Sequence, residues 1–204
     1  MSKTKDPVLE QRRRNQVMVA VQRLMSESSY GAMTMDRVAK AAGVSKGLIN
    51  YYFPSKEELV VASIRAYHAA EGQRLALIFE DTTLSAPQRL ERLVAAVFPD
   101  REAVEREVRF QIEVRAFAKT NPDVWRAIGD SYRGFRVACE AIMRRGRDDG
   151  YVTRATAPQE IRWVYLFFHS LVNGLAFQVA LDTELSIDEL RARLVAHIER
   201  MVTG

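Results

Sequence analysis

The sequence predicts an all-α protein in which a small N-terminal head is joined to a larger helical body. Apolar residues recur at three- and four-residue spacing along the chain, and the alternation of apolar and polar residues that is typical of strands is absent from the sequence. Helix start and stop signals divide this pattern into about nine helices. Of the 204 residues, 48% are hydrophobic and 27% are charged, which excludes a disordered or fibrous chain.

The first two helices end at recognisable turns. We expect the first over residues 8–28, and it gives way to a turn at residues 28–31. Thr34 can cap a short second helix over residues 35–42, because its side chain can accept a hydrogen bond from a free backbone N–H group. Gly43 follows at the position where a left-handed backbone turns the chain out of a helix.

A third helix and a long fourth helix follow. Ser45 can cap the third over residues 46–52, and Pro54 ends it because the residue before a proline is pushed out of helical geometry. Residues 55–58, Ser-Lys-Glu-Glu, form a capping box that starts the fourth helix, which should reach about residue 79. Its length indicates that it joins the head to the body.

Further start signals predict the helices of the body. Capping sequences occur at residues 85–88, 121–122, 156–159 and 186–189, with Thr156 as the cap in the third of them. The remaining helices are expected over residues 86–97, 102–119, 122–147, 157–181 and 187–202. We therefore divide the chain into a head of residues 1–55 and a body of residues 56–204.

One segment of the body has nearly the length of a membrane span. Residues 163–181 include no charged side chain over 19 positions. Polar residues that would each need a partner in lipid interrupt the segment, namely His169, Ser170, Asn173 and Gln178. The sequence has only one such segment, so we expect a buried helix of a soluble protein and no membrane partner.

The cysteine content and the first residues favour the cytoplasm. The single cysteine, Cys139, excludes a disulfide within the chain, and a small buried apolar residue is favoured over a redox switch at this position. The first residues, MSKTKDPVLEQRRR, lack the apolar run of a signal peptide. We therefore expect a cytoplasmic protein.

Residues 34–52 follow the plan of a helix-turn-helix, in which a tight turn joins two short helices and the second lies in the DNA major groove. Apolar side chains can pack this pair against the first helix, namely Val38, Ala41, Ala42, Val44, Leu48 and Ile49. The outward face of the second helix then carries Lys46, Gly47, Asn50 and Tyr51. Such helix pairs also occur in bundles without a DNA partner, so the plan alone leaves that alternative open.

The distribution of charge supports DNA binding. Residues 1–60 include ten basic and six acidic side chains, whereas the rest of the chain includes twenty of each. A basic head on a neutral body indicates a polyanionic partner for the head alone. The three arginines at residues 12–14 could form an arm that reaches the DNA backbone or minor groove, or a solvated helix face.

Residues 42–59, AGVSKGLINYYFPSKEEL, resemble the signature of the TetR (tetracycline repressor) family of bacterial transcriptional regulators. Residues 31–39, GAMTMDRVA, fit the same family, and the resemblance is strong over residues 10–60. The length, the helix count and the stretch LVNGL at residues 171–175 are more loosely similar to the body of the choline-responsive, BetI-type branch. The resemblance implies a helix-turn-helix DNA-binding head and a helical body for effector binding and dimerisation.

The resemblance implies eight DNA-contacting residues in the head. They are Thr34, Ser45, Lys46, Gly47, Asn50, Tyr51, Tyr52 and Lys56. Thr34, Ser45 and Lys46 lie at or beside helix N-termini, where free N–H groups and hydroxyls suit phosphate oxygens. Lys56 supplies a phosphate charge in family members, and Gly47 permits close approach to the bases.

Asn50 is the candidate for direct readout, because its amide can pair with adenine N6 and N7 for roughly 1–3 kcal/mol of discrimination. Of Tyr51 and Tyr52, the family places one hydroxyl against a phosphate and packs the other ring inward. Asp36 departs from the family pattern, since some relatives carry a base-reading cation near this position and phosphate repels an acid, so we assign it no role. Lys46 and Lys56 could instead be solvated charges.

A head of this size reads only a few base pairs, so a specific site should be a palindrome read by a two-fold homodimer. The resemblance implies that the last two helices form the dimer interface. Small residues that allow close approach are Ser170, Gly174 and Ala176, and apolar area comes from Leu171, Leu175, Phe177, Leu190, Leu194, Ile198 and Met201. The same residues suit a core within one chain, and that alternative stays open.

Aromatic residues are frequent in the middle helices and could line a pocket for a small-molecule effector. The expected ligand-binding residues are Phe110, Glu113, Phe117, Trp125, Tyr132, Phe135, Phe168, His169 and Asn173. A carboxylate amid aromatic rings is compatible with a cage for a cationic ligand. Plain packing is the alternative for each aromatic residue, and Glu113 can instead pair with Arg109 four positions earlier.

The resemblance implies a ligand-responsive bacterial transcriptional regulator, expected to be a repressor, that binds a double-stranded DNA operator as a homodimer. The alternative is a helical small-molecule-binding or scaffolding protein that does not bind DNA. An enzyme is not indicated, because His68, His169 and His197 are dispersed, and the sequence lacks HExxH and CxxC spacings and a glycine-rich phosphate loop. We therefore expect no catalytic residue, no metal site and no cofactor.

Overall fold

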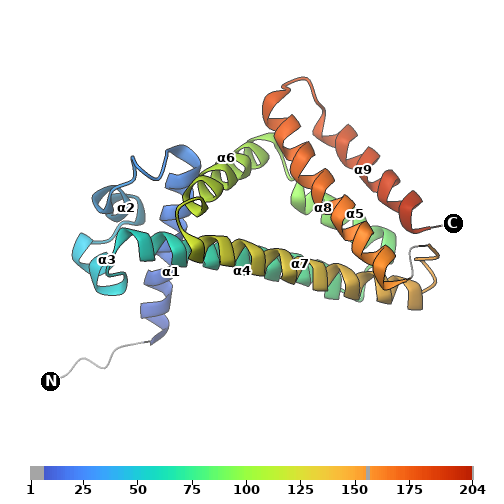
Figure 1. Ribbon diagram of the computed structural model, residues 1–204, viewed down its shortest axis with the longest axis horizontal. Helices are drawn as coiled ribbons and strands as arrows, with labels where there is room; N and C mark the ends of the chain where they lie inside the picture. The colour runs from blue at the N-terminus through green and yellow to red at the C-terminus, as the bar shows by residue number, and fades with distance from the viewer. Residues whose placement is uncertain (1–6, 155–156, 204) are drawn as a thin grey trace. The chain divides into compact units, whose positions relative to one another are not determined.

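The computed structural model describes residues 7–154 and 157–203, which form nine helices and no strand (Figure 1). The helices are α1 (Pro7–Glu27), α2 (Met35–Ala42), α3 (Lys46–Tyr52), α4 (Lys56–Glu80), α5 (Ala86–Val97), α6 (Arg101–Ala118), α7 (Pro122–Asp148), α8 (Pro158–Leu181) and α9 (Ile187–Val202). The prediction of an all-α fold is confirmed. Each predicted helix end lies within one residue of the end in the structure, because the capping signals that define these ends are local in sequence.

Caps in the body follow the predicted chemistry in part. The backbone N–H of Ser85 donates to Gln88 Oε1 at 2.9 Å, which is one half of the capping box that opens α5. The expected cap Thr156 lies outside the described residues. At the start of α8, Glu160 Oε2 accepts a hydrogen bond from the backbone N–H of Ala157 at 2.9 Å.

The chain divides into two compact units. The first comprises the residues up to Ala69 together with Arg109–Ile128, and the second comprises Ala70–Val108 together with the residues from Gly129 onward. The long helices α4, α6 and α7 each contribute to both units. The division predicted between residues 55 and 56 lies at the start of α4, and it stays a prediction.

The core of the first unit lies where α1, α2, α3 and the start of α4 meet. Val17 and Val21 of α1, Val38 of α2, Ile49 of α3 and Leu59 of α4 are each fully buried. Helix α2 packs against both α1 and α3 (Figure 1). Each short helix has one buried face, which determines which of its side chains point outward. The same side chains of α3 are therefore always exposed to solvent.

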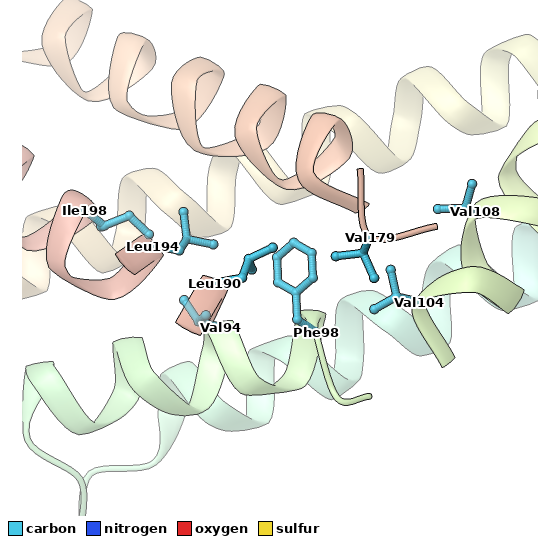
Figure 2. Close-up of a cluster of buried hydrophobic side chains, with 8 residues drawn as sticks. All are labelled: Val94, Phe98, Val104, Val108, Val179, Leu190, Leu194 and Ile198. Carbon is cyan, nitrogen blue, oxygen red and sulfur yellow. The ribbon is translucent and has the colours of Figure 1, made fainter. Parts of the chain in front are cut away.

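The core of the second unit is a cluster of apolar side chains from α5, α6, α8 and α9 and from the residue that follows α5. Figure 2 shows its members, which are Val94, Phe98, Val104, Val108, Val179, Leu190, Leu194 and Ile198. The ring of Phe98 lies in the middle of the cluster and is fully buried. Three residues that suited a dimer interface, Leu190, Leu194 and Ile198, are therefore part of a core within one chain.

Two arginines tie the loops of the second unit to its helices. Arg101, at the start of α6, donates from its guanidinium to the carbonyls of Asp182 at 3.0 Å and Leu185 at 2.6 Å, and also to the carbonyl of Val179. Arg191, on α9, donates to the carbonyl of Phe98 at 2.6 Å and to that of Pro99. Each guanidinium thus satisfies backbone acceptors of a loop far away in the sequence.

Helix α8 departs from its predicted environment. It has the length and composition of a membrane span, and we expected it to be buried, but only 17% of its most apolar 18-residue window is buried within the chain. Its exposed apolar side chains include Trp163, Phe167, Phe177 and Leu181. The prediction of a buried helix is wrong for a single chain, because α8 is apolar on more sides than its own chain covers.

Candidate nucleic-acid interface

The turn between α2 and α3 has the geometry that its residues predict. Thr34 Oγ1 accepts a hydrogen bond from the backbone N–H of Arg37 at 3.2 Å, which caps α2. Gly43 ends that helix with φ of 63°, in the left-handed region that favours glycine. Ser45 Oγ then accepts from the backbone N–H of Leu48 at 3.2 Å and caps α3, so only three residues separate α2 from α3.

Helix α3 presents a polar face to solvent. Ile49 is fully buried and anchors the opposite face of this seven-residue helix in the core of the first unit. Lys46, Gly47, Asn50 and Tyr51 are exposed, as the predicted outward face requires. The exposed side therefore offers a charge, a small residue, an amide and a phenol within two helical turns, a surface with the size and chemistry of a recognition helix.

The two neighbouring tyrosines differ in exposure. The side chain of Tyr51 is 57% exposed, whereas Tyr52 is half-buried, and their rings meet edge-on with centroids 5.2 Å apart. The guanidinium of Arg14 lies 5.8 Å from the ring centroid of Tyr52 and 4.8 Å from that of Phe53. Arg14 thus packs on the end of α3, a contact that the run of arginines at residues 12–14 does not reveal.

Lys46 forms an ion pair across the helix-turn-helix. Its ammonium donates to Asp36 Oδ2 at 2.8 Å, and both side chains are more than half exposed. Asp36 lies in the first turn of α2, and Lys46 is the first residue of α3. The acid that departs from the family pattern is therefore the partner of a predicted phosphate contact.

Lys56 is held by the turn that follows α1. Its Nζ donates to the carbonyl of Tyr30 at 2.6 Å and lies 3.9 Å from the centroid of the Tyr30 ring. Partial burial lowers the pKa of the Lys56 ammonium. Burial, and then the charge of Glu57, raise the pKa of the Tyr30 hydroxyl. Lys56 therefore connects the start of α4 to the turn before α2.

The same turn contacts α6. The backbone N–H of Tyr30 donates to Glu113 Oε2 at 3.0 Å, and the Tyr30 ring lies 4.4 Å from the ring centroid of Phe117. Asn121, which is buried, donates from its side-chain amide to Glu57 Oε1. Two of the expected ligand-binding residues, Glu113 and Phe117, therefore have partners in the head, which sequence spacing cannot reveal.

The other expected ligand-binding residues lie in both units. Phe110 and Trp125 belong to the first, where Phe110 is buried with its ring 4.6 Å from that of Tyr67, and Trp125 is exposed. The residues of the second unit are Tyr132, Phe135, Phe168, His169 and Asn173, all of them half-buried. The expected set is thus divided into a group on α6 and α7 of the first unit and a group on α7 and α8 of the second.

Three of the residues in the second unit lie together. The ring of Tyr132 lies 4.3 Å from that of His169, measured between centroids, and the side-chain amide of Asn173 donates to the carbonyl of His169 at 2.8 Å. Tyr165, another aromatic residue of α8, donates from its hydroxyl to the carbonyl of Tyr132 at 2.9 Å. Burial is the main cause that raises the pKa of this Tyr165 hydroxyl.

Comparison with known proteins decides the family. Residues 18–63, which include the helix-turn-helix, match the family of "Bacterial regulatory proteins, tetR family". Residues 86–203, more than half of the chain, match the family "BetI-type transcriptional repressor, C-terminal". The chain belongs to the TetR family. Both parts of the resemblance that the sequence carries, the TetR-type head and the BetI-type body, are confirmed for this TetR-family transcriptional regulator.

Individual relatives agree with this membership. The TetR-family regulator is 25% identical over 191 residues to the HTH-type transcriptional regulator PksA of Bacillus subtilis, which covers 93% of this chain and 89% of the relative. Its fold is similar to that of a transcriptional regulator from Saccharomonospora viridis in complex with choline, with a TM-score of 0.77 and 22% identity over 94% of this chain and 97% of the other.

A second solved structure carries a different ligand. FadR from Bacillus subtilis in complex with stearoyl-CoA has a TM-score of 0.70 and 17% identity over 92% of this chain and 98% of the other. At these identities the likeness shows the fold alone. One fold therefore accommodates a small quaternary ammonium in one protein and a long acyl chain in another.

Proposed function

We propose that this TetR-family regulator is a ligand-responsive repressor that binds a palindromic DNA operator as a homodimer. The observation that carries the proposal is the exposed face of α3, where Asn50 and Tyr51 stand outward from a helix whose other face is buried. Thr34, Ser45, Lys46, Gly47, Tyr52 and Lys56 complete the proposed contact surface. The protein acts by binding, not as an enzyme, and its place in the cell is the cytoplasm.

The proposed homodimer forms through α8 and α9. A groove with a volume of about 710 Å³ runs between these helices, and its apolar lining includes Leu171, Leu175 and Leu185. Ser170, Gly174 and Phe177 are exposed on α8, so small positions for close approach lie beside apolar area. The exposure of α8 in a single chain supports a second copy as its cover, since soluble proteins rarely leave such a surface to water.

The proposed effector is a small molecule that binds in the body. The Tyr132, His169 and Asn173 group supplies aromatic faces and a polar side chain to such a ligand. An effector regulates DNA binding only if its affinity differs between the two spacings of the heads in the dimer. The choline and stearoyl-CoA complexes of the structural relatives support a body that binds small molecules.

A titration of the intact protein on random duplex DNA tests the DNA-binding half of the proposal. The alternative, a helical ligand-binding or scaffolding protein, should give no affinity for DNA that depends on salt. A DNA-binding head should bind random duplex with an affinity that falls linearly with salt on logarithmic axes. Selection of bound sequences from a random pool should then return a palindrome. Weak binding without salt dependence would contradict the proposal.

Replacing Asn50 with alanine should relax base preference at one position of each half-site. The expected loss of discrimination there is about 1–3 kcal/mol, because a bidentate amide contact to adenine is removed. Selected-sequence logos of the two proteins measure the change. Asn15→Ala on α1 is a matched control, since Asn15 is also an exposed asparagine of the first unit. An unchanged logo in the Asn50→Ala protein would contradict direct readout.

Replacing Lys56 with alanine should weaken binding to all duplexes alike. One lost phosphate contact should lower the slope of log affinity against log salt by about 0.9. Lys56→Arg keeps the charge and should keep most of the slope, which separates the loss of charge from the loss of the hydrogen bond to Tyr30. Fluorescence anisotropy over a range of salt measures both variants. If Lys56→Ala leaves the slope unchanged, Lys56 only supports the head and the phosphate contact is wrong.

A further inference from the structure

Asp36 of α2 pairs with a lysine of α3, the helix that is proposed to face DNA. It lies in the first turn of α2, with its side chain 71% exposed, and its Oδ2 accepts from the ammonium of Lys46 at the start of α3 at 2.8 Å. Exposed ion pairs contribute little to stability, because water screens them and two side chains lose freedom. The pair therefore contributes little to the stability of the fold, and we consider a role for Asp36 in DNA binding.

The neighbouring cation is directed elsewhere. Arg37 follows Asp36 in α2, and its guanidinium donates to the carbonyl of Ala32 at 2.8 Å, in the turn before the helix. In the first turn of α2, the acid thus pairs with the recognition helix while the cation binds the chain's own backbone. A phosphate that approaches the start of α3 meets a carboxylate beside the lysine.

Both lysines of the proposed contact surface have partners within the chain. Lys46 is paired with Asp36, and Lys56 is held by the carbonyl and the ring of Tyr30. The affinity of a protein for non-specific DNA comes almost entirely from contacts between cationic side chains and phosphates. An acid that occupies one of two lysines lowers this component, whereas it leaves the neutral amide of Asn50 free to read a base.

We propose that Asp36 is a specificity-determining residue, which weakens the binding of this regulator to non-operator DNA by pairing with Lys46. On non-operator DNA the head has no fixed register, and its affinity depends on contacts with phosphate charges. Pairing of Lys46 with Asp36 therefore lowers this affinity most. On an operator the base contacts also supply affinity and fix the register of α3, so a weakened contact between Lys46 and phosphate lowers affinity less. The proposal rests on the proposed function, because it presupposes that α3 binds DNA.

The test compares Asp36→Asn with wild type on two probes, a random duplex and an operator duplex obtained by selection from a random pool. The substitution keeps the shape of an exposed side chain and removes its charge. We expect Asp36→Asn to bind the random duplex on the order of fivefold more tightly at low salt, with a slope of log affinity against log salt steeper by about 0.9. Affinity for the operator should rise less, so the ratio of the two affinities falls.

Two further variants show whether the effect is local. Glu27→Gln is the matched control, since Glu27 is an exposed carboxylate of the first unit that pairs with Arg23 on its own helix. It changes the net charge by the same amount and should leave both affinities within about twofold of wild type, because Glu27 pairs with a residue of α1 and not with a lysine of the proposed contact surface. In a Lys46→Gln background, the effect of Asp36→Asn should fall to less than half, because its partner is gone.

The outcomes separate the proposal from the proposed function. If wild type does not bind the random duplex in a salt-dependent way, the proposed function fails, and this inference fails with it. If wild type binds but Asp36→Asn behaves like Glu27→Gln, only the role of Asp36 is overturned. If Asp36→Asn gains the same factor in affinity for both probes, the role of Asp36 in specificity is overturned as well. A loss of preference at one cytosine of the operator would instead make Asp36 a base-reading residue, which also contradicts the proposal.

Discussion

Replacing Phe98 with alanine should lower the free energy of unfolding by about 3–5 kcal/mol, through the lost burial of the ring and the cavity that it leaves. The ring is fully buried in the middle of a cluster formed by α5, α6, α8 and α9 (Figure 2). No single neighbour can fill the space, because the facing side chains come from four separate helices. Such a loss is a large part of the 5–15 kcal/mol that is typical of a folded protein.

Denaturant unfolding followed by circular dichroism measures this change. Phe98→Leu should cost less than Phe98→Ala, because it leaves a smaller cavity. Val137→Ala on α7 is an exposed control in the same unit and should stay within about 0.5 kcal/mol of wild type. A Phe98→Ala protein as stable as the control would show that the cluster repacks and that Phe98 is not its centre.

Replacing Gly174 with glutamate should convert the proposed dimer to monomers. A side chain at Gly174 meets open space within the chain, so the fold of one subunit should tolerate it. In a dimer with closely packed α8 helices, the same side chain would place two like charges at the interface. Affinity for a palindromic operator should then fall by at least about a hundredfold, since two linked half-sites are no longer bound together.

Gly134→Glu is the matched control for this prediction. Gly134 is an exposed glycine within α7 of the same unit, and a side chain there also meets open space. Both variants add the same charge and the same helix-forming residue, so they differ only in position. Analytical ultracentrifugation at micromolar concentration measures the assembly. If Gly174→Glu sediments as wild type does, α8 is not packed closely at this residue in the assembly.

Local chemistry explains what the sequence could predict. Thr34, Gly43 and Ser45 define the turn between α2 and α3 through contacts within three or four residues, and such contacts repeat wherever these residue types occur at this spacing. The buried face of α3 was predicted correctly for the same reason, because the position of Ile49 follows from helical periodicity. The exposed face, which includes Asn50 and Tyr51, follows from the same periodicity, because it consists of the residues that do not lie on the buried face.

Contacts between distant residues explain what the sequence could not predict. The hydrogen bond from Lys56 to the carbonyl of Tyr30 joins residues 26 positions apart, and that from Tyr30 to Glu113 joins residues 83 positions apart. A lysine or a glutamate does not require such a partner, so the sequence left several interpretations open for Lys56 and Glu113. Glu113, expected in a ligand site or an ion pair with Arg109, accepts a backbone hydrogen bond from the head.

The environment of α8 shows a different limit. Composition establishes that a helix has apolar sides, but it does not say whether the same chain or a second one covers them. Trp163 and Phe167, with ring centroids 6.3 Å apart, are exposed in the single chain although they lie in the most apolar segment of the sequence. A single chain therefore does not bury α8, and its predicted burial depends on the proposed assembly of the chain with a second copy.

The two arginine contacts of the second unit bear on how this unit opens. Arg101 binds the carbonyls at the end of α8 and in the loop before α9, while Arg191 binds the carbonyls that follow α5. Opening either loop by itself would leave a guanidinium or several carbonyls without their partners. The amides of the last turn of α8 and the first turn of α6 should thus exchange hydrogen together, as one cooperative segment and not as two fraying ends.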